Sequence, residues 1–443
     1  MNGWQELYEE IVVANPLRGC RVITAYNEVI DLVHKLRNDD IQRLRLRKTT
    51  RLSKSLPRNL EDFAAALDFS LRNGVARELH VDNRLFKCLE SDYDFIHRIG
   101  GQAAIIGIVI SRFSGHPAII HPDRIDNLLS ALLENENLLL PIFSRKKVRL
   151  IAPSQIASRT RSERHLIFEF AKGQNTIAGG VCPRHNRLII DPISAIKIDS
   201  SFEKILPTIA QTCDVFVVSG LDHMGKDYES VFKRVASHVQ VVKESNPRTI
   251  VHLEITSMTD KKKMYAIATK ILPLFDSVGF NEAELVSLSS VMKNNPQHID
   301  RDFTLDDQFE AIEVLLKVGI KRIHLHTLGY HLRAGRTTNI ESSVRALAFS
   351  AAVGCAAAVR GMIPFPEDLR KLSLTPSQKG LRAVKALTDR LLHRSDALEF
   401  PRNPGNGFIC VPAPIIKEPQ LTVGLGDCIS GTCVAAEKMS GAI

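Results

Sequence analysis

The chain has 443 residues, of which 44% are hydrophobic and 24% charged, a balance typical of a globular protein rather than a disordered one. Its formal net charge of +9 favours anionic ligands such as nucleotides, sugar phosphates or nucleic acid. No apolar run has the length of a membrane span, and the first five residues do not resemble a signal peptide, so we expect no membrane partner.

The cysteines and the basic residues indicate which kinds of site and which cellular compartment are expected. The eight cysteines are scattered and none forms a Cys-x-x-Cys pair, which argues against a zinc site and a disulfide framework and is typical of a reducing cytoplasm. The strongest basic run extends from Arg43 to Lys48 and continues to Arg51 and Lys54. It lacks interleaved aromatic residues, so a solvated helix face is favoured over a nucleic-acid site.

The first expected strand covers residues 21–25, and polar residues follow it. Asn27 and Asp31 come where this strand should end. Enzymes with α/β folds present such groups to small ligands at the carboxyl edge of a sheet. Turn or cap residues are an equally good interpretation of the two positions.

Residues 32–96 show a different pattern, with charged helices such as 62–71 and short apolar segments, and they predict a separate lobe that interrupts the core. The core resumes at Gly100-Gly101-Gln102, which opens an apolar helix. A glycine pair at that point permits a ligand to approach helix N–H groups, although tight helix packing would also explain it.

Strands and helices then alternate, which predicts a mostly parallel sheet covered by helices on both faces. The expected strands are 117–120, 138–140 and 148–152, with a helix at 125–133. Two further strands, 165–170 and 187–190, have no obvious helix between them and suit a return to the interrupting lobe. Cations accompany them and could close over a phosphate or form a solvated face: Lys172, Arg184 and Arg187.

Two later strands, at 249–255 and 276–280, have acidic residues at or just after their ends. His252 and Glu254 share a face of the strand at 249–255, since side chains alternate along a strand. The strand at 276–280 runs into Asn281 and Glu284. Acids at adjacent strand ends could hold a hydrated Mg²⁺, because Mg²⁺ takes a few oxygen ligands and keeps its waters. Helix N-terminal carboxylates that stabilise the helix dipole would explain the same residues.

The remaining core elements are expected as a strand at 215–218, helices at 227–243, 306–317 and 346–358, and a strand at 322–327. His324 and His326 share a face of the last strand. They have no third ligand nearby, so a wall for an aromatic ring or a phosphate is more plausible than a metal site.

The most informative stretch is Gly424-Leu-Gly-Asp427 near the C-terminal end. The glycines permit close approach of a ligand, and a helix starting there would point free N–H groups at a phosphate. Asp427 beside that anion could accept a proton from an attacking hydroxyl. A glycine-rich turn with a capping aspartate is the simpler interpretation. The chain has neither a Walker-type loop nor the protein-kinase motifs.

Taken in order, these pieces resemble the ADP-dependent sugar kinases of the ribokinase-like fold, which include ADP-dependent glucokinases and phosphofructokinases. The pieces that carry the resemblance are Tyr26-Asn27 to Asp31, Gly100-Gly101-Gln102-Ala103, Pro183-Arg184 with Asn186-Arg187, His252-x-Glu254, Asn281-x-x-Glu284, His324-x-His326-Thr327 and Gly424-Leu-Gly-Asp427. They span nearly the whole chain. His-x-Glu together with Asn-x-x-Glu is the combination typical of the ADP-dependent branch.

The resemblance implies a role for each piece. Asp427 would be the catalytic base, the backbone of Gly424 and Gly426 would form the anion hole, and Arg187 would stabilise the transferred phosphoryl group. Glu254 and Glu284, supported by Asn281, would organise Mg²⁺ or another divalent cation. ADP, the phosphoryl donor, would lie against His326, Thr327, Val423 and Leu425. The expected sugar-binding residues are Asn27, Asp31, Glu78, Gly101, Gln102, Lys172 and Arg184.

The acceptor is less clear from the residues. Glu78 is a candidate for the lid glutamate that contacts glucose in glucokinases, whereas Lys172, Arg184 and a basic lid suit fructose 6-phosphate. We expect transfer of the β-phosphoryl group of Mg-ADP to fructose 6-phosphate, with glucose as a further acceptor, in a modified glycolysis that releases AMP. An ADP-dependent glucokinase alone is the nearest competing hypothesis. An ATP-dependent kinase of the same fold and a catalytically silent sugar- or nucleotide-binding regulator also stay open.

Two positions depart from the family pattern. Val29 stands where many members have a second asparagine, and Cys428 replaces the usual threonine after the catalytic aspartate. The expected architecture is a large α/β/α nucleotide-binding domain (1–31, 98–159 and 193–443) with a smaller inserted α+β lid domain (32–97 and 160–192). We expect a cytoplasmic monomer or small homo-oligomer with no nucleic-acid partner.

Overall fold

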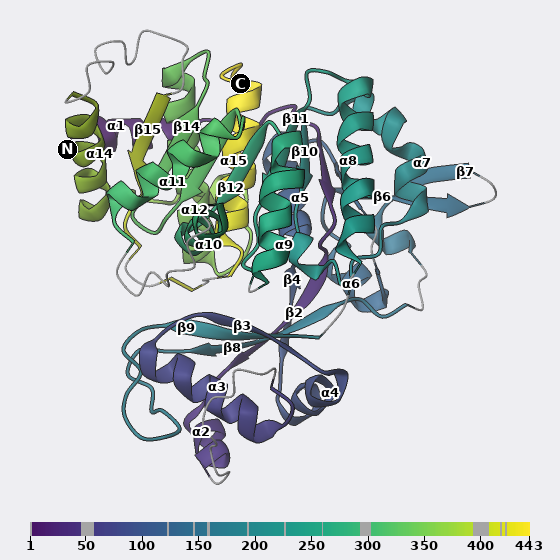
Figure 1. Cartoon of the computed structure of the whole chain (residues 1–443), viewed down its shortest axis with the longest axis vertical. Coiled ribbons are helices and arrows are strands. Elements are labelled where there is room, and N and C mark those ends of the chain that lie inside the picture. The colour runs from purple at the N-terminus through teal and green to yellow at the C-terminus, as the bar shows by residue number, and fades with distance from the viewer. Residues whose placement is uncertain are drawn as a thin grey trace.

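The computed structural model describes residues 2–45, 57–121, 124–144, 147–156, 160–192, 195–225, 227–258, 260–292, 303–392, 407–416, 419–420 and 423–443. The second half of the basic run, including Lys48, Arg51 and Lys54, lies outside these residues. Two sheets organise the described part, a large one in the upper lobe of Figure 1 and a small one in the lower lobe.

The large sheet has ten strands in the order β15-β14-β13-β12-β11-β10-β1-β5-β6-β7. From β13 to β6 all neighbours pair in parallel, while β14, β15 and β7 add antiparallel pairings at the two edges. The bounds are β1 Val22–Ala25, β5 Ala118–Ile120, β6 Leu138–Ser144, β7 Lys147–Ile151, β10 Val215–Val218, β11 Ile250–Glu254, β12 Ser277–Phe280, β13 Arg322–His326, β14 Tyr330–Gly335 and β15 Gly407–Pro412.

Helices cover both faces of this sheet, which is the expected arrangement for buried parallel strands. The helices are α1 Asn2–Ile11, α5 Gln102–Ser114, α6 Asn127–Leu132, α7 Ser200–Ile209, α8 Tyr228–Ser245, α9 Lys261–Ala266, α10 Glu282–Met292, α11 Leu305–Lys317, α12 Ile340–Arg360, α13 Pro366–Leu369, α14 Gln378–Leu392 and α15 Leu425–Met439. One apolar core contains residues of α5, α12 and α15, and the other contains residues of α7, α8, α9, α10 and α11.

Helix α12 is long and apolar enough, by length and composition, to cross a membrane, which the sequence expectation had not allowed for. However, 78% of the most apolar 18-residue stretch of this helix is buried inside the fold. It packs against α15 and α1, so its alanine-rich surface serves close helix packing.

The small sheet has the order β3-β9-β8-β2-β4 and lies below the large one in Figure 1. Its strands are β2 Val29–Lys35, β3 Arg77–Val81, β4 Ile96–Gly100, β8 Arg164–Phe170 and β9 Asn186–Pro192. Three helices accompany it, α2 Asn38–Arg45, α3 Leu60–Asn73 and α4 Asn83–Asp92. The chain therefore leaves the large sheet after β1, returns at α5, and visits the small sheet again with β8 and β9.

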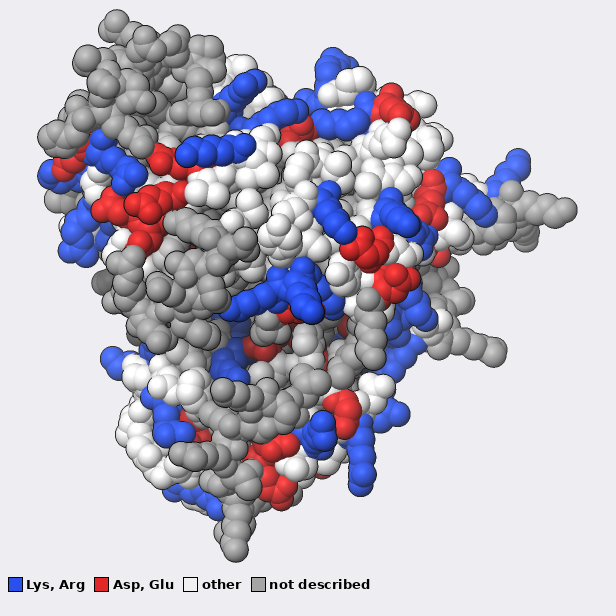
Figure 2. All heavy atoms as spheres, in the orientation of Figure 1, with Lys and Arg blue, Asp and Glu red and all other residues white. Residues whose placement is uncertain are grey.

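All eight cysteines lie in the described residues and are free thiols. Seven are buried, and Cys88 on α4 is partly exposed. On the face seen in Figure 2, lysine and arginine side chains alternate with aspartate and glutamate and do not gather into one continuous basic surface.

Candidate active site

A pocket of about 210 Å³ opens where the carboxyl ends of the central strands face the small sheet. Its lining comes from both lobes. It includes fifteen of the predicted site residues: Asn27, Asp31, Glu78, Gly101, Gln102, Arg187, Glu254, Asn281, Glu284, His326, Val423, Gly424, Leu425, Gly426 and Asp427. Segments that are far apart in the sequence therefore meet in one cavity.

The glycine-rich stretch forms the N-terminus of α15. Gly424 is the N-cap and has a φ of 74°, in the left-handed region that favours glycine. A Cβ on Gly426 would lie 2.7 Å from Cε1 of His326, so the loop and the end of β13 are in close contact. The free N–H groups of the first helical turn, and the positive end of the helix dipole, face the pocket that Leu425 and Gly426 line.

Asp427 lies in the first turn of α15 and has an unusual protonation equilibrium. Burial, and after it the nearby negative charge of Glu254, raise the pKa of this carboxyl group to about 7. The side chain of Gln102 and the charge of His326 act in the opposite direction. A carboxyl group with a pKa near neutrality can gain and lose a proton at physiological pH, as a general base must.

Glu254 sits at the centre of a buried hydrogen-bond network. His252 Nε2 lies 3.2 Å from Glu254 Oε2, and His326 Nε2 lies 3.1 Å from Glu254 Oε1. The hydroxyl of Ser430 also donates to Glu254 Oε2. Burial alone would raise the pKa of Glu254, but the hydrogen bonds from His252 and His326 outweigh it and bring the pKa down to about 2.

Glu284 is also buried, but its pKa is raised, whereas that of Glu254 is lowered. Its Oε2 accepts a hydrogen bond of 2.8 Å from the Asn281 N–H, while Asn281 Oδ1 accepts one of 3.1 Å from the Glu284 N–H. The helix-terminal capping that the sequence left open is therefore present. Burial raises the pKa of Glu284 to about 8 despite the Asn281 bond. At neutral pH and without a bound cation, some of the carboxyl groups of the site, such as Glu284, are therefore protonated.

The opposite wall of the pocket contains Asp31, which lies within β2 and not at the end of a core strand as expected. Gly100, its neighbour on β4, leaves room for it, since a Cβ there would lie 2.2 Å from Asp31 Oδ1. A Cβ on Gly101 would lie 2.4 Å from the Asn27 carbonyl oxygen, so the glycine pair lets the segment at 27–31 approach closely. Burial raises the pKa of Asp31 to about 6.

Comparison with known proteins gives the family. The conserved region of the ADP-specific phosphofructokinases and glucokinases matches residues 20–436. The chain belongs to this family. The prediction made from the ordered motifs is therefore confirmed.

The relatives of the chain extend over almost its whole length. An ADP-dependent glucose/glucosamine kinase from Pyrococcus abyssi is 29% identical over 462 aligned residues, covering 98% of each chain. An ADP-specific phosphofructokinase from the same organism is 27% identical and covers 92% of this chain and 95% of its own. A solved ADP-dependent kinase in complex with fructose-6-phosphate and ADPβS superposes with a TM-score of 0.84 at 24% identity, covering 100% and 99%. The predicted fold class is thereby confirmed.

Three predicted site residues do not line the pocket in this structure. Lys172 is exposed, and Arg184 donates from Nε to the Gly74 carbonyl oxygen at 2.7 Å, which holds it against α3. Thr327 uses its hydroxyl inside the turn between β13 and β14, where it donates to the Tyr330 carbonyl oxygen at 2.8 Å. This hydrogen bond closes the turn.

Several lining residues were not expected from the sequence. They are Ile105, His165, Ile167, Ile189, Asp222, His223, Thr256 and Ser257. His165 on β8 stacks on His223 of the large lobe, with ring centroids 5.5 Å apart. His223 Nε2 lies 3.0 Å from Asp222 Oδ2, and although burial lowers its pKa, Asp222 raises it to about 10.

These histidines contact acids on every side. Ligating atoms of Glu163, His165 and His223 lie within 4.8 Å of one another, as do those of Glu78, Asp222 and His223. Both sets share His223, whose Nε2 already pairs with Asp222 Oδ2 at 3.0 Å, and this ion pair accounts for part of the cluster. Only one of these residues could have been expected from the sequence: Asp222 follows the predicted strand at 215–218, where polar residues of an α/β site often lie.

Proposed function

We propose that the protein transfers the β-phosphoryl group of Mg-ADP to a hexose hydroxyl and releases AMP. The observation that carries this proposal is the position of Asp427. It lies in the first turn of α15, in the same pocket as Arg187, Glu254 and Glu284. Membership of the ADP-specific phosphofructokinase/glucokinase family supports ADP as donor.

The residues divide the chemistry among them. Asp427 accepts the proton of the attacking hydroxyl, and the N–H groups of Gly424–Asp427 hold the phosphoryl oxygens. Arg187 is half-buried near Glu78, Asp31 and Asp427, and this partial burial lowers its pKa, although it remains cationic. Its guanidinium supplies positive charge where the transferred group develops negative charge.

The donor set fits a hydrated divalent cation such as Mg²⁺. Both oxygens of Glu254 already accept hydrogen bonds, so Glu254 would hold a cation through its water shell. Glu284 has a raised pKa that a nearby cation would lower, and Asn281 supports it. When bound, Mg²⁺ neutralises phosphate charge.

The charge of the sugar end favours a neutral hexose such as glucose. Glu78, Asp31 and Asp222 line that end. The cations there among the described lining residues are Arg187 and His223, and His223 is already paired with Asp222. Lys172 and Arg184, which suited a sugar phosphate, lie outside the lining. Fructose 6-phosphate remains the second candidate because Arg187 can pair with a second phosphate.

We further propose that the small lobe is a lid domain that excludes water from the transferred group and prevents hydrolysis of the donor. The predicted ranges, 32–97 and 160–192, overlap the segments that build the small sheet. A cytoplasmic location suits the eight free thiols.

A coupled assay tests the function directly. Mg-ADP and Mg-ATP are each offered with glucose and with fructose 6-phosphate. We expect turnover with ADP that Asp427→Ala lowers by at least about 1,000-fold, on the scale of losing a catalytic base together with its electrostatics. Turnover with ATP only would point to an ATP-dependent kinase. Binding of sugar or ADP by calorimetry without turnover would point to the silent regulator.

A further inference from the structure

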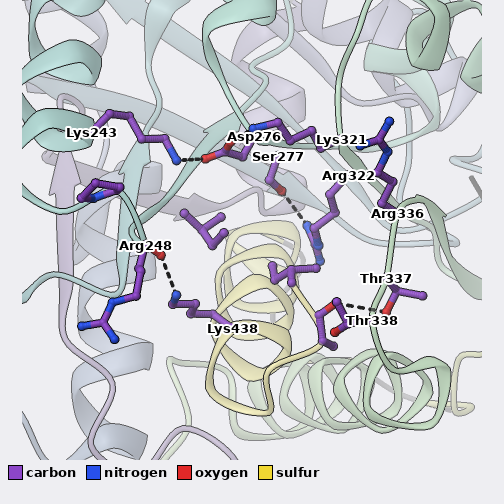
Figure 3. A pocket seen from close by; sticks show the side chains of 14 residues that line it. Lys243, Arg248, Asp276, Ser277, Lys321, Arg322, Arg336, Thr337, Thr338 and Lys438 are labelled. Atoms are coloured by element: carbon purple, nitrogen blue, oxygen red, sulfur yellow. Dashed lines mark hydrogen bonds and ion pairs between the residues drawn. The ribbon is translucent and has the colours of Figure 1, made fainter. Parts of the chain in front are cut away.

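A second cavity, of about 500 Å³, lies at the opposite edge of the large sheet. It is formed where β11, β12 and β13 begin, and the C-terminal end of α15 lies beneath it (Figure 3). None of its lining residues belongs to the catalytic pocket. Its volume is in the range of small-molecule sites.

The lining is strongly cationic. Six basic side chains contribute to it, and Asp276 is the one acidic side chain among the described lining residues. The basic residues are Lys243, Arg248, Lys321, Arg322, Arg336 and Lys438. Except for the adjacent Lys321 and Arg322, they come from different parts of the chain, and they surround the cavity in Figure 3. Their mutual repulsion is relieved when an anion binds between them.

The buried charges of the cavity floor already have partners. Asp276 is 8% exposed and pairs with both Lys243 and Lys321, the latter at 2.7 Å. Arg322 pairs with Glu437 behind the floor and donates to Ser277 Oγ at 2.8 Å. Asp276 and Glu437 are therefore already paired and are not partners of the cations at the rim of the cavity.

The rim cations are Arg248, Arg336 and Lys438. Within the described part of the chain, the guanidinium groups of Arg248 and Arg336 have no carboxylate at ion-pair distance, and both side chains are exposed. Lys438 Nζ donates to the Arg248 carbonyl oxygen at 2.5 Å, which fixes the ammonium group at the cavity mouth. Three uncompensated cations around one cavity match the several oxygens of a phosphate group.

The cavity also has an apolar part. Pro247, Ile250 and Ala442 lie among the lining residues beside the cations. A cavity of this volume is larger than a single phosphate ion requires, so the apolar surface can receive the organic part of a ligand. The combination suits a phosphorylated metabolite of mononucleotide size.

A buried hydrogen-bond chain connects this cavity with the catalytic pocket. Arg322 donates to Ser277 Oγ, which lies 2.8 Å from His252 Nδ1. With the Ser277 hydroxyl donating to Nδ1, the opposite nitrogen of His252 carries the hydrogen that it donates to Glu254 Oε2 at 3.2 Å. Glu254 in turn contacts His326, which lines the catalytic pocket. Such a chain of buried bonds polarises as a unit.

We propose that this cavity is a second anion site, which binds a phosphorylated metabolite and acts on catalysis through the Ser277–His252–Glu254 chain. Binding itself is independent of the proposed kinase function, whereas the effect on catalysis rests on it. The two parts are therefore tested separately.

Equilibrium dialysis with labelled AMP, pyrophosphate and inorganic phosphate tests binding. The test variant is Arg248→Ala/Arg336→Ala, and the matched control is Arg18→Ala/Arg370→Ala, which removes two exposed arginines outside both pockets. We expect the test variant to bind one AMP per chain fewer than the wild type, or to bind it at least tenfold more weakly, and the control to bind as the wild type does. We expect inorganic phosphate to bind at least tenfold more weakly than AMP.

Equal AMP stoichiometry and affinity in the wild type and the test variant would overturn the site. Equal affinity for AMP and inorganic phosphate would overturn the assigned ligand size. The comparison between variants holds whether or not AMP also occupies the catalytic pocket. The affinities of AMP and inorganic phosphate are compared for the binding that the test variant loses. Loss of the kinase activity alone would leave the binding result intact.

Steady-state kinetics tests the link. AMP that competes with ADP raises KM alone, so a change in kcat at saturating ADP reports the second cavity. We expect AMP to change kcat at least twofold in the wild type and the arginine control. No change is expected in Arg248→Ala/Arg336→Ala or in Ser277→Ala, which keeps the rim but interrupts the chain. An unchanged kcat in the wild type, or a full response in Ser277→Ala, would overturn the link.

Discussion

At the scale of single residues, the catalytic pocket holds neighbouring carboxyl groups in different protonation states. Glu254 has a pKa of about 2 because histidines donate to it, whereas Asp427 and Glu284, with fewer donors, have pKa values of about 7 and 8. Environments that push the pKa values of neighbouring acids apart are typical of sites that assign different chemical roles to them.

The raised pKa of Asp427 predicts a pH-dependent stability. Since the ordinary value is 3.8 and the folded value about 7, the fold favours the protonated form and loses stability as the pH rises from about 4 to 7. Asp427→Asn removes this loss. We expect it to raise the free energy of unfolding at pH 8 by on the order of 4 kcal/mol, and by less at pH 5. Urea unfolding at both pH values measures this.

Asp276→Asn is the matched control with the opposite sign. Burial would raise the pKa of Asp276, but Lys243 and Lys321 lower it, so its stabilisation is present above pH 4 and is lost on acidification. This variant should be less stable than the wild type at pH 8. An Asp427→Asn variant that is also less stable at pH 8 would contradict the assigned pKa.

Glu78 is the residue that should select the sugar. Its pKa is raised well above the ordinary value by burial and by Asp191, and it lines the sugar end of the pocket. Glu78→Ala should lower kcat/KM for glucose by at least about tenfold, since lost hydrogen bonds to a buried acid cost that much. It should lower kcat/KM for fructose 6-phosphate less, or raise it. An equal loss with both sugars would indicate a structural role.

Most of the pocket could be predicted from the sequence because its residues follow glycines or strand ends, where spacing carries information. His165 and His223 could not, because their proximity depends on how the small lobe meets the large one. Thr327 follows His326, which lines the pocket, but the Thr327 side chain turns into the β13–β14 connection. Sequence spacing gives the neighbourhood of a side chain and leaves its direction open.

At the scale of elements, α15 joins the catalytic loop to the second cavity. Its first turn carries Asp427, and Glu437 near its end pairs with Arg322 and Arg333. Both arginines are almost fully buried, so this helix is fixed at its far end by charge pairs that are costly to break one at a time.

Gly426→Ala tests the contact at the near end of α15. The new Cβ would lie 2.7 Å from His326 Cε1, so the imidazole must shift, which disturbs its 3.1 Å contact with Glu254 Oε1. We expect kcat/KM for ADP to fall by at least about tenfold, as for other small displacements of catalytic groups. Gly3→Ala, at a glycine with no heavy atom within 4 Å of the new Cβ, is the control and should be unchanged. Normal kinetics of Gly426→Ala would show that His326 has room to adapt.

The alternation of apolar strands and helices predicted the elements of the large sheet from β1 to β13 well. It did not predict β14 and β15, which pair antiparallel at one edge, or β2, β3 and β4 of the small sheet. The sequence of β2 predicts a strand end or a turn because Asp31 interrupts the apolar pattern. That residue is buried within a strand because Gly100 leaves space for it. The sequence also missed that β7 is antiparallel to β6.

At the scale of the whole molecule, the two lobes meet through the stacked rings of His165 and His223. His223→Ala removes the stack and leaves Asp222 without its partner. We expect the KM for the sugar to rise by at least about fivefold, since closure of the small lobe over the sugar loses this contact, with a smaller change in the KM for ADP. His185→Ala, at an exposed histidine of the small lobe, should change neither. Equal changes in both KM values would place the effect elsewhere.

The uneven burial of the thiols has a practical consequence for measuring motion between the lobes. Cys88 is the partly exposed cysteine, and it lies on α4 beside the small sheet. A maleimide dye added to the wild-type chain should therefore attach at a single position in the small lobe, without prior removal of the other seven cysteines. The natural sequence thus provides a reporter that would distinguish open from closed molecules by fluorescence as sugar and nucleotide are added.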